Sequence, residues 1–584
     1  MLAGLSAWNL KHAGEHFGVN RDPGVYSVSA VGLAEQGDLL FEVDESPFTA
    51  AEGLSTKGAG FYDRRSGQDL EAQFSHLTAV LLAIAYWLGD LRLLVSLNSL
   101  ISGLAGLLLF GMLRRWASPW ASLIGTGVVA FSLPFAYVAR DAFSEPASLV
   151  IVLSAVVQLS RMAAGLKSDI AGWVLGGLLA GSLLIARIDG VVLLPSLLAM
   201  LAVLAIRRPE LPYSHISAAA GGALVAGAIG MTDLRLRGGR YLDDLWPQTH
   251  MALILLGAVV LVAPLVVAVW PRIPFRDRVR VVHERWTHLV GTIAVGFVLF
   301  TWLARPSLYS AIGSFDNNLI RGLQAREGLE SEPTRTYAES TLTWLSWYLG
   351  PVVLLLAALG AGLSSLQVLR DRLSALLVPL FLLGGLTLLY LYRPSISPDQ
   401  LWATRRFVPQ GLPFVALLLA IALDRILDGI PRPTGQWPPK VLLAFSTLLV
   451  PVLSWIPLRA VHTDRMTISA IKTICHQTSE GQPVLILDDE LGPQLVQTVQ
   501  LVCGVPSAFT SADSAASLAG LAAAWADEDR ELLVLSGPAV DLSSVADLRL
   551  SISDPAQVLE RTVERPPEEI HFSSIELRLW SVRL

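Results

Sequence analysis

The chain has 584 residues, of which 53% are hydrophobic and only 16% are charged, and its mean hydropathy is +0.54. Soluble domains carry about 25% charged residues, so this composition excludes an ordinary soluble protein and predicts a polytopic protein within a lipid bilayer. The net charge of −6 is modest, and Lys and Arg fall in short clusters between apolar runs, so no nucleic-acid partner is indicated.

The first 75 residues are polar and rich in Gly and Asp, and they are predicted to form a large irregular loop. Within this loop the segment "NRDPGVYS", Asn20 to Ser27, places an acid before a proline and a glycine. Asp-Pro-Gly is a good turn sequence, so one interpretation of Asp22 is that it only shapes a turn.

Apolar runs of roughly 17 to 25 residues predict helices that cross a bilayer, because a helix satisfies its own backbone hydrogen bonds there. Twelve such runs are found, at approximately Leu91 to Leu113, Ala117 to Val138, Ser144 to Met162, Ile170 to Ala186, Gly190 to Ile206, Ser214 to Met231, Thr249 to Trp270, Trp286 to Ala304, Trp344 to Leu366, Leu373 to Tyr392, Val408 to Leu427 and Val441 to Leu458. A thirteenth run, His76 to Gly89, is short and is interpreted as an interfacial or re-entrant helix.

Basic residues near helix ends are retained on the cytoplasmic side of a membrane. Six basic clusters share one side if the His76 run does not cross: Arg114 with Arg115, Arg161 with Lys167, Arg207 with Arg208, the run from Arg272 to Arg285, Arg370 with Arg372, and Arg425 with Arg432. The external face then receives the start of the chain, the C-terminal tail, and the loops around Arg140, Arg187, Arg240, Asp316 and Arg405.

Two later segments on the predicted external face are also large. Residues 305–343 form a loop too long for a simple turn, and long loops are often functional. Residues 459–584 are predicted to be a separate external α/β domain, because "PVLILDD", "ELLVLSG" and "SIELRLWSVRL" indicate strands, with Ala-rich helical stretches between them. The domain has no GxGxxG or P-loop spacing, so packing or acceptor docking are the roles it suggests.

The only cysteines are Cys475 and Cys503, both in this tail. Two cysteines exclude a disulfide framework and a CxxC-type metal site, and they leave a single bridge between them open.

Charged residues at the ends of apolar helices are costly and tend to mark function. Four predicted external loops contain them: Asp22, Arg140, Asp141, Glu145, Arg187, Asp189, Arg405 and Arg406. Structural interpretations exist for each loop, because Glu145 can complement a helix dipole, Arg187 and Asp189 can pair, and arginines can anchor a helix at the headgroups. Two adjacent external arginines oppose the usual orientation trend, however, and an anionic phosphate would explain them through arginine's forked donor array.

His76 precedes the short interfacial run, where a helix-start or surface histidine is the simpler interpretation. No second His or acid stands at metal-ligand spacing from it, and the chain has no HExxH motif or Cys-His cluster. The motifs therefore predict no metal site.

Three features together resemble the GT-C superfamily of membrane glycosyltransferases. They are a long first external loop with an acid in "RDPGVY", a later turn with a second acid in "RDAFSEP", and an Arg-Arg pair opening a late span. The superfamily includes protein O-mannosyltransferases, aminoarabinose transferases acting on lipid A, and actinobacterial mannosyl- and arabinosyltransferases, and "RDPGVY" looks like the actinobacterial type. The likeness covers residues 20–430, in layout more than in letters.

The resemblance implies a polytopic GT-C fold and an inverting transfer of a sugar from a polyprenyl-phosphate carrier to a hydroxyl of a glycan, lipid or protein acceptor. It implies Asp22 as the base that deprotonates the acceptor, and Arg405 or Arg406 as the group that binds the donor phosphate. Glu145, the second-loop acid, would position the acceptor or the sugar, or hold a divalent cation with Asp22. Supporting roles fall to Arg140, as a partner of either acid, and to Asp141, Arg187, Asp189, His76 and Tyr26.

The chain departs from the family at its beginning. GT-C proteins have a transmembrane helix before the first external loop, whereas residues 1–19 are too short and polar to span and lack the pattern of a secretory signal. We therefore expect a further helix upstream of Met1.

Two other functions stay open, a transporter or lipid flippase and a scaffold with an external sensing domain. A transporter should carry its charges along a midplane path between internal repeats. The enzyme predicts instead that Asp22, Glu145 and Arg405 or Arg406 converge on one external cavity open to lipid.

Overall fold

The computed structural model describes residues 1–583 apart from residues 50, 65–68, 166–168, 273–275, 315, 370–373, 430–436, 457–458, 511–519 and 522–530. Several predicted features lie outside the described residues. They are the basic-cluster members Lys167, Arg370, Arg372 and Arg432, and most of the Ala-rich stretch at 511–530.

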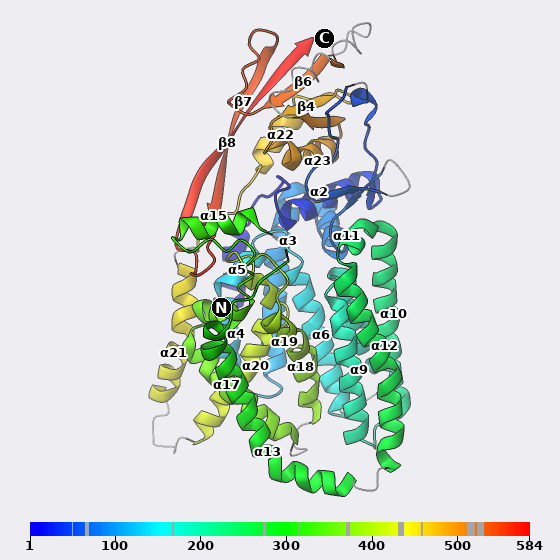
Figure 1. Cartoon of the computed structure of the whole chain (residues 1–584). Helices are drawn as coiled ribbons and strands as arrows, with labels where there is room; N and C mark the ends of the chain where they lie inside the picture. Colours follow the sequence, from blue (N-terminus) through cyan, green and yellow to red (C-terminus); the bar gives the residue numbers. More distant parts are fainter. Residues whose placement is uncertain are drawn as a thin grey trace.

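The molecule is elongated, with a bundle of long helices below and a sheet domain from the C-terminal tail above (Figure 1). The helices between the N-terminal region and the tail, most of which form the bundle, are α3 (Leu77–Leu113), α4 (Pro119–Ala130), α5 (Leu133–Ala139), α6 (Glu145–Ala163), α7 (Ile170–Gly181), α8 (Leu183–Ala186), α9 (Gly190–Arg207), α10 (Tyr213–Arg237), α11 (Gly239–Asp244), α12 (Trp246–Val269), α13 (Arg276–Leu299), α14 (Arg305–Leu308), α15 (Asn318–Arg326), α16 (Thr341–Leu349), α17 (Pro351–Leu369), α18 (Leu377–Leu382), α19 (Gly384–Tyr392), α20 (Gly411–Gly429) and α21 (Trp437–Trp455). The short helix α15 lies across the upper end of the bundle (Figure 1).

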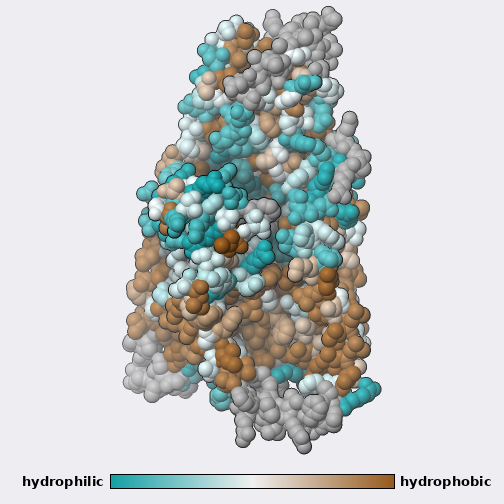
Figure 2. Space-filling view, viewed as in Figure 1, coloured by the Kyte–Doolittle hydropathy of each residue, from teal (hydrophilic) through white to brown (hydrophobic). Residues whose placement is uncertain are grey.

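Seven of the described helices are long and apolar enough to cross a membrane, or eight if α4 and α5, which meet at 65°, form one broken span. Hydrophobic residues form a band across the lower half of the face shown in Figure 2, and none of the apolar window of α12 is buried within the protein. Exposed apolar surface of this extent marks a membrane or protein contact, and its position on long apolar helices fits a lipid bilayer. The predicted helical membrane fold is thus confirmed, while the count of twelve spans stays a prediction.

The short run before the first long span is part of α3 but is separated from it by a sharp break. Gly89 and Asp90 leave the helical conformation, and Asp90 has a φ of 60°. Before the break the helix packs on α2 (Asp22–Gln36), where Trp87 donates a hydrogen bond to the Ala34 carbonyl at 3.1 Å. Trp87 and Leu88 are 64% and 76% exposed, as expected for an interfacial helix.

The first 75 residues are more ordered than the predicted irregular loop. They form α1 (Leu2–Lys11), α2, and a small antiparallel sheet in the order β1-β3-β2 from β1 (Leu40–Phe41), β2 (Phe61–Asp63) and β3 (Leu70–Ala72). Of the two interpretations of Asp-Pro-Gly, the one as a simple turn does not hold, because Asp22 and Pro23 begin α2. Proline is tolerated in the first turn of a helix, where no backbone N–H is needed, and an acid there complements the helix dipole.

The tail forms the predicted α/β domain. It contains α22 (Ile468–Cys475), α23 (Gly492–Cys503) and a five-stranded sheet in the order β5-β4-β6-β8-β7, with β4 (Val484–Leu487), β5 (Ser507–Thr510), β6 (Glu531–Ser536), β7 (Asp547–Leu559) and β8 (Ile570–Arg583). Strand β4 runs parallel to β5 and β6, and the other pairs are antiparallel. Cys475 and Cys503 form a disulfide, which joins the ends of α22 and α23.

A long hairpin of β7 and β8 reaches from the sheet down to the bundle beside α15 (Figure 1). At its tip, the Gln400 N–H donates a hydrogen bond to the Thr562 carbonyl at 2.8 Å. The Val563 N–H donates to Glu327 Oε1 at 2.6 Å. The tip therefore ties the tail to the 305–343 loop and to the segment just before Arg405.

Candidate active site

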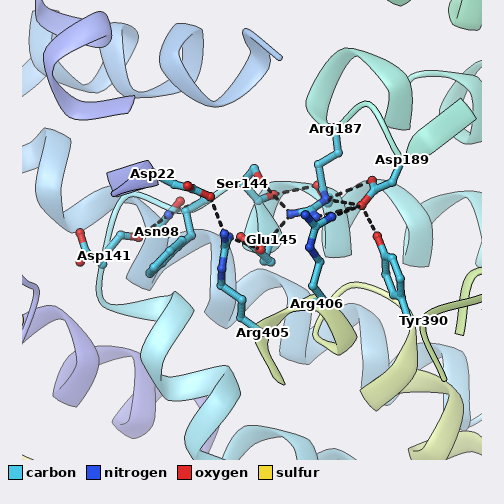
Figure 3. Close-up of polar contacts among 12 residues, drawn as sticks. Asp22, Asn98, Asp141, Ser144, Glu145, Arg187, Asp189, Tyr390, Arg405 and Arg406 are labelled. Carbon is cyan, nitrogen blue, oxygen red and sulfur yellow. Dashed lines mark hydrogen bonds and ion pairs between the residues drawn. The ribbon is translucent and has the colours of Figure 1, made fainter. Parts of the chain in front are cut away.

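Asp22 is the first residue of α2, and the local packing fixes where this helix begins. Gly24 lies so close to the preceding chain that a Cβ atom there would stand 2.4 Å from the Gly18 carbonyl oxygen. Only glycine allows this approach. The close contact holds the start of α2 against residues 18–19, so that Asp22 Oδ2 points at the Arg405 guanidinium at 2.5 Å (Figure 3).

Glu145 begins α6 and lies at the centre of the cluster. Asn98 of α3 donates hydrogen bonds to the carbonyls of Asp141 and Phe143, and these fix the turn before α6. Glu145 is fully buried, and its Oε1 accepts hydrogen bonds from Arg405 at 2.6 Å and Arg187 at 2.8 Å. Among the described residues its Oε2 is buried without a hydrogen-bond partner.

Arg405 and Arg406 come from the short 3-10 helix η6 (Thr404–Phe407), and they point to different acids. Arg405 bridges Asp22 and Glu145, as Figure 3 shows. Burial alone would lower the pKa of Arg405, but the two carboxylates raise it above its usual value, so Arg405 stays charged. Arg406 donates instead to Asp189 at 3.3 Å.

The second half of the cluster centres on Asp189, just before α9. Its carboxylate pairs with Arg187 at 2.9 Å and also accepts a hydrogen bond from the Tyr390 hydroxyl at the end of α19. Burial alone would raise the pKa of Asp189, but Arg187 and Arg406 hold it at about 2. Two carboxylates, Glu145 and Asp189, thus share three guanidinium groups in a nearly dry site.

The polar groups of the cluster are not all paired. The Nε atoms of both Arg405 and Arg406 are buried without a hydrogen-bond partner among the described residues, like Glu145 Oε2. Buried polar groups are normally satisfied, so unpaired ones in a cluster are candidates for ligand contacts. Asp22 has 15% and Asp189 has 12% of its side chain exposed, whereas Glu145 is fully buried. Asp189 is held by both Arg187 and Arg406, so Asp22 is the exposed acid with fewer ion pairs.

Tyr26 and His76 are two predicted supporting residues that form no ion pair with this cluster in the described structure. Tyr26 is buried on α2, where burial and the nearby Asp22 raise its pKa, and it stacks on Phe74 with ring centroids 5.3 Å apart. His76 does not join the cluster, because its Nδ1 pairs with Asp233 of α10 at 2.7 Å. It is therefore a structural histidine that ties the start of α3 to α10.

Arg140 and Asp141 belong to a separate network. Arg140 Nε donates to Asn9 Oδ1 of α1 at 3.0 Å, and another nitrogen donates to the Val461 carbonyl at 3.3 Å. The expectation that Arg140 pairs with Asp22 or Glu145 gains no support from these contacts, which point toward α1 and the tail. Asp141 accepts hydrogen bonds from His16 at 3.2 Å and from Thr463 at 3.0 Å.

Several residues of the site escaped the sequence analysis. Trp402 has Arg21 at 4.1 Å and Arg405 at 3.9 Å from its ring centroid. Two like charges cannot share one face at this distance, so they stack on opposite faces. Arg21 also pairs with Asp399 at 2.9 Å. Arg21, Asp399 and Trp402 stand close to predicted site residues in the sequence, in "NRDPG" and "DQLWATRRF", and this closeness is the signal that could identify them. Tyr390 has no such signal, because it looks like any aromatic residue at the end of a span.

Arg405 lies between the two acids that the resemblance offered as ligands of a divalent cation. In the described part of the chain, no group of three or more His, Cys, Asp or Glu side chains comes together as metal ligands. The observed contacts make the Arg405 guanidinium the counter-charge of both carboxylates.

No protein-family model matches the sequence, and no curated protein matches it either. Solved structures do match. The Archaeoglobus fulgidus oligosaccharyltransferase in the apo form aligns with a TM-score of 0.52 at 13% identity, over 92% of this chain and 69% of that chain. The complex of the same protein with Zn and sulfate aligns at 0.50 and 13%, over 92% and 67% of the two chains.

ArnT from Cupriavidus metallidurans in the apo state aligns over 99% of this chain and 96% of that chain, at 12% identity with a TM-score of 0.44. The archaeal structures, with TM-scores of 0.50 and above, show that the chain has the GT-C fold. A shared fold does not by itself assign an activity, which has to be argued from the site.

Proposed function

We propose that the protein is an inverting glycosyltransferase that moves a hexosyl or pentosyl group from a polyprenyl-phosphate carrier to an acceptor hydroxyl. One observation carries the proposal. Four residues from distant parts of the sequence, Asp22, Glu145, Arg405 and Arg406, meet in one cluster at the end of a helical membrane bundle. Two arginines with unpaired buried nitrogens beside a reachable carboxylate suit a phosphate leaving group and a base.

The names of solved neighbours agree with a lipid-phosphate donor. The archaeal oligosaccharyltransferase has been solved in complex with an inhibitory peptide and a dolichol-phosphate, and ArnT has been solved bound to undecaprenyl phosphate. Among the GT-C subgroups, the "RDPGVY" segment favours the actinobacterial type for this chain.

The chemistry follows from the placement of the charges. The acceptor oxygen attacks the anomeric carbon while its proton passes to Asp22. The bond from the anomeric carbon to the phosphate oxygen breaks, and its electron pair leaves with the polyprenyl phosphate. Arg405 and Arg406 stabilise the growing charge on that phosphate without reorganising. Displacement by the acceptor itself inverts the anomeric carbon.

Donor binding also prepares the base. Before the donor arrives, Arg405 holds Asp22 in an ion pair, so the Asp22 carboxylate faces the guanidinium and not an acceptor. A donor phosphate draws Arg405 to itself, so that Asp22 is released to face the acceptor. Glu145 is fully buried and paired with Arg405 and Arg187, so its role is to position these arginines.

Arg405 supplies the positive charge between the two acids, so we expect transfer to need no added divalent cation. Transfer measured with and without a chelator checks this expectation, and the two rates should be equal. A large loss with chelator, restored by one particular cation, would contradict it.

We place the site at the external face of the cytoplasmic membrane. The disulfide of the tail supports this placement, because such bonds persist in oxidising compartments outside the cytoplasm. The basic α12–α13 junction supports it too, since that junction lies at the end of the bundle opposite the tail (Figure 1).

The alternative of a transporter or lipid flippase gains less support. A transporter needs its charged groups along a path through the middle of the bundle. In the described structure the Asp22, Glu145, Asp189 and arginine cluster gathers at the ends of α2, α6, α9 and α19 instead.

The test is transfer from a panel of radiolabelled polyprenyl-phosphate sugars by membranes with wild-type protein or Asp22→Asn. Loss of a general base typically costs about 10²- to 10⁴-fold, so we expect a fall of that size. Asp44→Asn changes an exposed acid of the same N-terminal region and serves as the matched control. Unchanged transfer by Asp22→Asn would remove Asp22 from the mechanism, and the product's anomeric configuration tests inversion.

A further inference from the structure

A cavity next to the cluster has a chemistry that the proposed transfer does not use. It has a volume of about 70 Å³ and lies between the start of α2, the segment before Arg405, and the tail domain. Six of its lining residues carry the argument: Arg21, Asp399, Trp402, Arg465, Gln557 and Arg561. We propose that this cavity binds an anionic group, a carboxylate or a phosphate, of the acceptor. The inference rests on the proposed function.

The cavity adjoins the base. Arg21 and Pro23, the two neighbours of Asp22, both line it. Trp402 forms the wall toward the donor side, because Arg405 stacks on one face of its ring and Arg21 on the other. An acceptor whose charged group sits in the cavity therefore has its hydroxyls close to Asp22, on the side away from the donor phosphate.

The cations of the cavity have partners, with one exception, and among its acids Asp399 has a buried Oδ1 atom without a hydrogen-bond partner among the described residues. Arg21 pairs with Asp399 at 2.9 Å, and Arg465 donates to Gln494 at 2.7 Å. The remaining acids are also occupied, since Asp141 is held by His16 and Thr463, and Asp464 accepts from the Glu15 N–H at 2.9 Å.

Arg561 is the exception: among the described residues no carboxylate stands within ion-pair distance of its guanidinium. Burial, and then the like charge of Arg21, lower its pKa, and the charge of Asp399 offsets this only in part. An incoming anion would remove this penalty.

Arg561 is also held in place before any ligand arrives. It lies at the tip of the β7–β8 hairpin, where Glu560 N–H donates to the Glu569 carbonyl at 3.0 Å and the Thr562 carbonyl accepts from Gln400. The backbone on both sides of Arg561 is thus fixed, so little backbone entropy is lost on binding.

The size of the cavity fits a charged group and not a whole sugar. A water needs about 10 to 15 Å³ of such space, so this cavity holds several waters or one small anion. Gln557 supplies an amide at the same wall, which can orient the anion or a neighbouring hydroxyl. The acceptor class is therefore a hydroxylated molecule with a carboxylate or phosphate near the reacting hydroxyl.

The experiment measures binding by the purified full chain, without any transfer. The probes are methyl β-glucuronide, methyl β-glucoside 6-phosphate and the neutral methyl β-glucoside, which share one ring and differ in charge. We expect at least one anionic probe to bind about tenfold or more tightly than the neutral one, since charge-assisted hydrogen bonds are the strong ones. The better of the two anionic probes distinguishes carboxylate from phosphate.

Four proteins are compared: wild type, Arg561→Gln, Arg561→Lys and Arg406→Gln. Arg561→Gln should abolish the preference for the anionic probe, Arg561→Lys should keep part of it, and Arg406→Gln, on the donor side of Trp402, should keep all of it. Thermal unfolding of each variant shows that the comparison is made on folded protein.

Equal binding of charged and neutral probes by the wild type would overturn the inference, as would an unchanged preference in Arg561→Gln. A preference lost in Arg406→Gln instead would assign the anion to the donor site and overturn it as well. These outcomes are separate from the fate of the glycosyltransferase proposal, which depends on transfer by Asp22→Asn.

Discussion

Two acids of a single turn, Asp141 and Glu145, are both buried but belong to regions with opposite properties. Asp141 Oδ1 accepts from the Ala142 N–H at 2.8 Å, and its Oδ2 accepts from His16 and Thr463. Glu145 Oε1 accepts hydrogen bonds from both Arg187 and Arg405, whereas its Oε2 has no partner among the described residues. Asp141 therefore joins three segments of chain, whereas Glu145 still has an oxygen that can accept a further hydrogen bond.

The difference teaches how to separate a structural charge network from a functional one. Burial alone does not distinguish them, because Asp141 is 2% and Glu145 is 0% exposed. Their hydrogen bonds do distinguish them: both oxygens of Asp141 have partners, whereas one oxygen of Glu145, beside the unpaired Nε atom of Arg405, has none among the described residues. Four predictions follow this contrast, and the first is the Asp22→Asn test, with the largest expected loss.

Glu145→Gln should break the functional network. An amide cannot balance Arg187 and Arg405, and leaving buried charges uncompensated costs about 3 to 5 kcal/mol of stability. We also expect transfer per folded molecule to fall by about 10²-fold or more, because the phosphate-binding arginines lose their positions. Transfer assays and thermal unfolding on the same preparation measure both effects. Nearly normal transfer by a folded Glu145→Gln would show that the cluster is structural.

Asp141→Asn should lower the stability of the protein and leave its transfer activity nearly unchanged. It removes the charge that holds His16 and Thr463, which is expected to cost about 1 to 3 kcal/mol of unfolding free energy. Transfer per folded molecule should stay close to that of the wild type. If a fully folded Asp141→Asn lost transfer as severely as Glu145→Gln, the two networks would have to be treated as one.

The smallest effect should be a pH dependence of stability that comes from His16. Burial alone would lower the pKa of His16, but Asp141 outweighs it and raises the pKa above 6.5. A raised pKa in the folded state gives stability that is complete below pH 6.5 and is lost as the pH rises through the folded value. The melting temperature of the wild type should therefore fall as the pH rises above 6.5.

His16→Gln keeps a hydrogen-bonding side chain but cannot titrate, so its melting temperature should change less over this range. The measurement is thermal unfolding of both proteins at several pH values. A wild-type melting temperature that rises over the same range would contradict the assigned ion pair with Asp141.

Much of the fold could be predicted from local patterns. The apolar runs marked the long helices, the short run at His76 was correctly separated from the first span, and "PVLILDD" and "ELLVLSG" became β4 and β6. The N-terminal region was not predicted, because Asp-Pro-Gly is equally a good turn and a good helix start. The sequence could not decide the disulfide, since the positions of Cys475 and Cys503 in the chain do not reveal the distance between them.

For the candidate site, the sequence determined which charged turns exist, because acids and arginines at the ends of apolar runs are visible locally. Only the tertiary structure decided which of them meet. Arg405 bonds to Glu145 and Asp22 across separations of 260 and 383 residues, and Asp141 and Glu145 carry the same local signal but have different partners. Pairing over such separations depends on how the helices pack, and no local pattern encodes that.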